Sequence, residues 1–196
     1  MKRNEYLYPN LQANANRGFR DVLNLQVYRN TYLQEMALLF VLGAAGFLVP
    51  FLLNHVQLFV GPVVNAMLVA SALFLRGKKI LPLVLMPSLG ALVGGLMFGG
   101  FTMYLLYMVP FIWAGNLIMV YAVKSVHLGR GMNYWASAAI ASVAKALLLF
   151  CSAFVLYSFG LVPVLFLTAM GAMQLFTALA GSIIAYPLKH IRRTPA

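Results

Sequence analysis

The chain has 196 residues, of which 63% are hydrophobic and only 9% are charged. Its mean hydropathy is +0.88. About a quarter of the residues in a typical soluble domain are charged, and a soluble domain of this size could not bury so much apolar surface. The composition therefore excludes a soluble enzyme and a disordered chain. Because the apolar runs are long and do not alternate with polar residues, we expect an all-α integral membrane protein.

The formal charge is +11, from 14 Lys and Arg residues against three acids. In a membrane protein such an excess indicates topology rather than nucleic-acid binding, and we expect no nucleic acid as a partner. The single cysteine, Cys151, leaves no intramolecular disulfide and no cysteine metal cluster. Residues 1–33 are polar and lack the apolar core of a secretory signal, so we expect insertion through the first membrane helix.

Six apolar stretches are each near the roughly 20 residues that cross a bilayer, which predicts a bundle of six transmembrane helices. They run over about Met36–Leu53, Val56–Phe74, Ile80–Phe98, Phe101–Val123, Ala136–Phe159 and Leu161–Tyr186. Breaks are expected at Asn54-His55, Arg76–Lys79, Gly99-Gly100, Lys124–Trp135 and Gly160. The predicted organisation is a juxtamembrane segment (1–33), a membrane domain (34–188) and a short basic tail (189–196).

Thirteen of the 14 Lys and Arg residues lie outside the predicted spans, all in segments on the same side. They are Lys2, Arg3, Arg17, Arg20, Arg29, Arg76, Lys78, Lys79, Lys124, Arg130, Lys189, Arg192 and Arg193. By the positive-inside rule, both termini are expected in the cytoplasm and the protein in the plasma membrane. The basic, aromatic segment 1–33 is interpreted as a helix on anionic headgroups or as a docking arm for a cytoplasmic partner.

Small residues spaced four apart predict close helix contacts. Ala91, Gly95 and Gly99 follow this spacing in the third span, and Ala66 and Ala70 follow it in the second.

Polar residues at membrane depth are the candidate ligand-binding residues, because they are costly in lipid. They are Asn65, Trp113, Asn116, Lys145 and Gln174, from four different spans. Lys145 has no carboxylate at its depth, so it is neutral, bonds to carbonyl or amide oxygens, or meets a ligand carboxylate or phosphate. The amide side chains either bond helix to helix or orient a polar ligand. One shared polar cavity is predicted.

Catalytic arrangements are not recognisable in the sequence. It contains no Ser-His-Asp set, paired carboxylates or phosphate-binding loop, and His55 is predicted on the opposite side from His127 and His190. We therefore expect no enzyme activity, no metal site and no cofactor.

Five segments, taken in order, resemble an S component of an energy-coupling factor (ECF) vitamin transporter, in the branch whose substrates are unassigned. They are QLFVGPVVNAML (57–68), PSLGAL (87–92), MVPFIWAGNLIMV (108–120), ASVAKALLLF (141–150) and MGAMQLFTALAG (170–181). The resemblance covers about residues 35–186. It implies a six-helix subunit that binds a micronutrient from the outside and pairs with a T component and two ATPases. It also implies that Asn65, Asn116, Lys145 and Gln174 lie at positions lining the ligand cavity.

A second function remains open on the sequence. The basic, aromatic N-terminal segment is also typical of a membrane anchor or scaffold subunit in a larger complex, including a redox complex.

Overall fold

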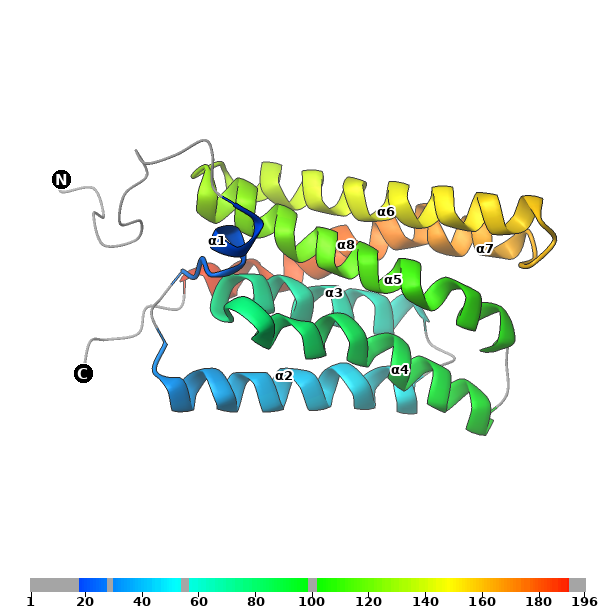
Figure 1. The fold of residues 1–196 in the computed structure, drawn as a ribbon, viewed down its shortest axis with the longest axis horizontal. Coiled ribbons are helices and arrows are strands. Elements are labelled where there is room, and N and C mark those ends of the chain that lie inside the picture. Colours follow the sequence, from blue (N-terminus) through cyan, green and yellow to red (C-terminus); the bar gives the residue numbers. More distant parts are fainter. Residues whose placement is uncertain (1–17, 28–29, 54–56, 99–101, 191–196) are drawn as a thin grey trace.

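The computed structural model describes residues 18–27, 30–53, 57–98 and 102–190, and these confirm the all-α prediction: they form helices and no strand (Figure 1). The α-helices are α1 (Phe19–Leu23), α2 (Tyr32–Leu52), α3 (Gln57–Phe74), α4 (Leu81–Phe98), α5 (Thr102–Ala122), α6 (Tyr134–Ser158), α7 (Leu165–Met170) and α8 (Ala172–Ala185). Two 3₁₀ segments, η1 (Gly77–Ile80) and η3 (Tyr186–His190), and a π-helical segment, η2 (Val123–Gly129), extend them.

The outer surface of the bundle is apolar. Phe40, Leu96 and Leu147 are each more than half exposed. Among the described residues, five helical stretches are long and apolar enough to cross a membrane: Tyr32–Leu52, Gly77–Met97, Met103–Gly129, Tyr134–Ser158 and Leu165–Lys189. The helix α3 has a shorter apolar stretch, Leu58–Phe74. These properties are those of a multi-pass membrane protein.

The helices pack mainly as three pairs: α2 with α4, α3 with α8, and α5 with α6. Glycine permits two of these contacts. A Cβ atom on Gly90 of α4 would lie 2.2 Å from the carbonyl oxygen of Phe47 of α2, and one on Gly94 would lie 2.5 Å from that of Phe51. The α2–α4 contact therefore depends on Gly90 and Gly94, one position before the predicted Ala91 and Gly95.

The second close contact, between α3 and α8, uses Gly181. A Cβ atom on Gly181 would lie 2.6 Å from the Cβ atom of Asn65 and 2.7 Å from the backbone nitrogen of Ala66. Ala66 is buried here, as the spacing of small residues predicted.

The connections between spans differ from the predictions at two places. Residues Lys124–Gly129 do not break the helix, because η2 continues α5 through them and α6 begins at Tyr134. The last predicted span is divided at Gly171, between α7 and α8, where a Cβ atom would lie 2.9 Å from the Phe150 ring. The break at Gly160 is confirmed, since this residue has φ +70° in the turn after α6. The breaks at Asn54-His55 and Gly99-Gly100 lie outside the described residues.

One end of the bundle collects α1, η1, η2 and η3, and we call it the basic end (Figure 1). Its described cations are Arg20, Arg76, Lys78, Lys79, Lys124, Arg130 and Lys189. Residues 18–27 fold onto this end, where Val22 and Val27 are buried and the Val27 amide donates to the Leu73 carbonyl at 2.9 Å. Residues 1–17, 28–29 and 191–196, which belong to the predicted terminal segments, lie outside the described residues.

Candidate functional site

Lys145 lies near the middle of α6 and joins three helices through a chain of hydrogen bonds. Its side chain is 2% exposed, and its Nζ donates to Oδ1 of Asn65 of α3 at 2.6 Å. The Asn65 amide nitrogen donates to the Gly61 carbonyl at 2.9 Å and to the Thr177 hydroxyl of α8 at 3.3 Å. Thr177 in turn donates to the backbone carbonyl of Gln174 at 3.2 Å. We call Lys145, Asn65 and Thr177 the lysine group.

Two glycines pack directly against side chains of the lysine group. Gly61 lies against Thr177, where a Cβ atom would be 2.7 Å from the Thr177 methyl carbon. Gly115 of α5 lies against the alkyl chain of Lys145, with an added Cβ 3.4 Å from its Cγ atom. Any larger residue at Gly61 would push α8 away and separate Thr177 from Asn65.

The lysine group is electrostatically unusual because its partners are neutral. The two described carboxylates are Asp21 and Glu35, and both belong to the basic end. Glu35 is already paired there with Arg76, at 3.1 Å, and with Lys79. Amide and hydroxyl dipoles compensate a buried ammonium only in part.

A second polar group joins α4 and α5. Trp113 Nε1 donates to the Ser88 hydroxyl at 2.6 Å, and Asn116 Nδ2 donates to the Val84 carbonyl at 3.0 Å. The Asn116 side-chain oxygen is buried without a hydrogen-bond partner among the described residues, as is the Ser142 hydroxyl of α6. This second group therefore retains unused acceptor capacity inside the bundle.

The structure thus brings the predicted site residues together in two sets. Asn65 and Lys145 are in direct contact, whereas the Gln174 backbone carbonyl accepts only the local bond from Thr177 on its own helix. Trp113 and Asn116 bond to α4 instead. Because Gly115 packs on Lys145, the neighbouring Asn116 lies at a similar depth. One cavity shared by both sets stays a prediction.

A network at the basic end was not anticipated from the sequence. Glu35 is fully buried and, besides its two cations, accepts a hydrogen bond from Gln26. Lys124 is also buried, and its ammonium donates to the carbonyls of Leu75, at 2.8 Å, and Leu25. The available signal was the position of Glu35, an isolated acid directly before an apolar run.

Comparisons with known proteins add no family assignment: no protein family, curated protein or solved structure gives a significant match to the chain.

Proposed function

We propose that α2, α3, α4, α5, α6 and the α7–α8 pair cross the plasma membrane, with both termini in the cytoplasm. The charge distribution supports this orientation. Among the described cations only Lys145 lies away from the basic end, and the described residues joining α6 to α7 at the far end contain no Lys or Arg. The positive-inside rule assigns the basic end to the cytoplasm.

Within this topology, we propose that the chain is the substrate-binding membrane subunit of an ECF-type micronutrient transporter. The observation that carries the proposal is the buried Lys145 ammonium, hydrogen-bonded to a neutral amide at the centre of the bundle. Lysine has three N–H donors, so a ligand carboxylate or phosphate can bond to the same ammonium beside Asn65. The ligand is a small polar molecule that enters from outside and supplies the missing anionic charge.

The test is the small-molecule content of the purified full chain, measured by mass spectrometry after gentle solubilisation from its native host. We expect one co-purifying compound in the wild type, and its loss in Lys145→Met, which keeps the side-chain length without the charge. Ser152→Ala is the matched control, because Ser152 lies on the same helix and bonds only to its own turn, at the Leu148 carbonyl. Equal ligand content in the wild type and a folded Lys145→Met variant would contradict the proposal.

A second candidate function is a membrane anchor or scaffold subunit of a larger complex. It is favoured by the surface of the basic end, where Phe19, Arg20, Lys78 and Arg130 are exposed. Such a surface suits an acidic cytoplasmic partner. This function predicts a bound peripheral or redox protein and no dependence on Lys145.

A further inference from the structure

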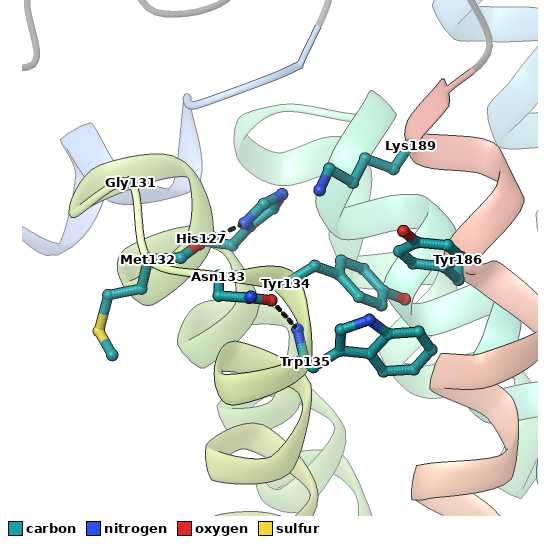
Figure 2. Close-up of a pocket in the computed structure, with 8 residues that line it drawn as sticks. All are labelled: His127, Gly131, Met132, Asn133, Tyr134, Trp135, Tyr186 and Lys189. Atoms are coloured by element: carbon teal, nitrogen blue, oxygen red, sulfur yellow. Dashed lines mark hydrogen bonds between the residues drawn. The ribbon is translucent and has the colours of Figure 1, made fainter.

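A pocket of about 310 Å³ opens at the basic end, separate from the lysine group (Figure 2). It lies where the 131–133 turn, the first turn of α6 and η3 meet. The residues that matter for its chemistry are His127, Asn133, Tyr134, Trp135, Tyr186 and Lys189. None of the residues lining it is acidic.

His127 supplies a buried polar atom that makes no hydrogen bond within the described part of the chain. The side chain is 3% exposed, and its Nδ1 lies 2.9 Å from the Met132 carbonyl oxygen. A carbonyl can only accept, so Nδ1 carries the hydrogen of this bond. Nε2 is buried with no hydrogen-bond partner among the described residues. In Figure 2 this nitrogen points toward the Lys189 ammonium, and both side chains line the pocket.

Lys189 supplies the positive charge. Its ammonium lies 5.9 Å from the ring centre of Tyr134 and 5.8 Å from that of Tyr186. Trp135 stacks on Tyr186 with ring centres 4.6 Å apart, which makes an aromatic wall beside the ammonium. The pocket also lies at the N-terminus of the 25-residue helix α6, where the helix dipole is positive.

The Lys189 ammonium and the N-terminus of α6 bring positive charge to one hollow that no carboxylate lines, which defines a site for an anion. Beside them, Nε2 of His127 can accept a hydrogen from the bound group. Phosphate fits the two groups better than a carboxylate does. Its charged oxygens accept from Lys189, and its remaining O–H donates to Nε2 of the neutral imidazole. Tyr and Trp at a membrane interface are suited to lie beside such a group at headgroup level.

We propose that the pocket formed by His127, Lys189 and the N-terminus of α6 binds a phosphate group. The group belongs to an anionic phospholipid head or to a soluble phosphate compound. This inference does not depend on a ligand at Lys145.

The experiment uses the full chain and has two arms. In delipidated detergent solution, thermal stability is measured against inorganic phosphate, with chloride at matched ionic strength as the reference. In nanodiscs of phosphatidylcholine with or without phosphatidic acid, lipid retention is measured by native mass spectrometry after extraction. Saturable stabilisation by phosphate identifies a soluble source, and selective retention of phosphatidic acid without that stabilisation identifies the lipid head.

Lys189→Met and His127→Gln are the test variants, and Lys78→Met, an exposed cation at the same end, is the control. We expect affinity in the responding arm to fall about tenfold or more in each test variant, as for a lost charged hydrogen bond, and to stay unchanged in the control. The proposal is overturned if the wild type responds in neither arm. It is also overturned if folded Lys189→Met and Lys78→Met respond alike. If one test variant does not fold, the proposal is still tested by the other variant and by the comparison of phosphate with chloride in the wild type.

Discussion

Lys124 closes the C-terminal end of α3. The last carbonyls of a helix have no partner within it, and at this end the Leu73, Phe74 and Leu75 carbonyls are taken by groups from elsewhere in the chain. The Lys124 ammonium bonds to Leu75 and also to Leu25 of the N-terminal segment. This one side chain therefore ties η2, α3 and the segment before α2 together.

Lys124→Met should lower the free energy of unfolding by about 1–3 kcal/mol, because it leaves the buried Leu75 carbonyl and the partly buried Leu25 carbonyl without this donor. It should also make residues 18–27 more sensitive to protease. Thermal unfolding and limited proteolysis in detergent measure the two effects. Lys78→Met removes an exposed charge from the same end and should change stability by less than about 0.5 kcal/mol. Equal stability of the two variants would contradict the capping role.

The negative charge of Glu35 stabilises the basic end. Glu35→Gln keeps the shape but leaves Arg76 and Lys79 without a carboxylate. We expect a loss of about 2 kcal/mol, less than for a fully buried ion pair, because Arg76 is half exposed. The measurement is the thermal unfolding temperature, with the exposed Asp21→Asn as the control. A Glu35→Gln protein as stable as the control would show that hydrogen bonds suffice here.

The polar residues at membrane depth were predictable individually, but their partners were not. Hydropathy identifies Asn65 and Lys145 as exceptions within apolar runs, and both are buried. Their direct contact depends on the α3–α6 geometry, which no local pattern encodes. Trp113 and Asn116 instead face α4, because Ser88 and the Val84 carbonyl are one helical turn apart there.

At the scale of the elements, glycine sets the distance between α2 and α4. Gly90→Ala should destabilise the protein by about 1–3 kcal/mol, because the added Cβ would lie 2.2 Å from the Phe47 carbonyl oxygen and force the helices apart. Gly43→Ala on α2 is the matched control, since its Cβ would meet nothing within 4 Å. Thermal unfolding of both variants distinguishes them, and a tolerated Gly90→Ala would contradict the close contact.

Hydropathy located the helices because long apolar runs dominate this chain, but it misplaced two of their ends. From hydropathy, a charged residue such as Lys124 predicts a loop. In the structure the Lys124 ammonium donates hydrogen bonds to backbone carbonyls, and the helix continues through it as η2. The division at Gly171 has no polar signal, and Gly171 lies in close contact with the Phe150 ring. Neither effect is local in sequence.

At the scale of the whole molecule, the orientation that we propose in the membrane rests on the charges at the basic end. In a Cys151→Ser background, a cysteine at Phe159, between α6 and α7, should react with an impermeant thiol reagent added outside intact cells. A cysteine at Lys78 should react only after the cells are opened. Both positions are exposed in the structure. The reverse labelling pattern would reject the proposed topology.

We propose that this bundle is the substrate-binding subunit of an energy-coupled transporter. The most direct measurement is the protein composition of the intact complex, recovered from its native membrane in mild detergent through a tag on this chain. We predict a membrane T component and two ATPases, recovered together with this chain. Recovery with a redox or peripheral enzyme in place of the ATPases would contradict the claim.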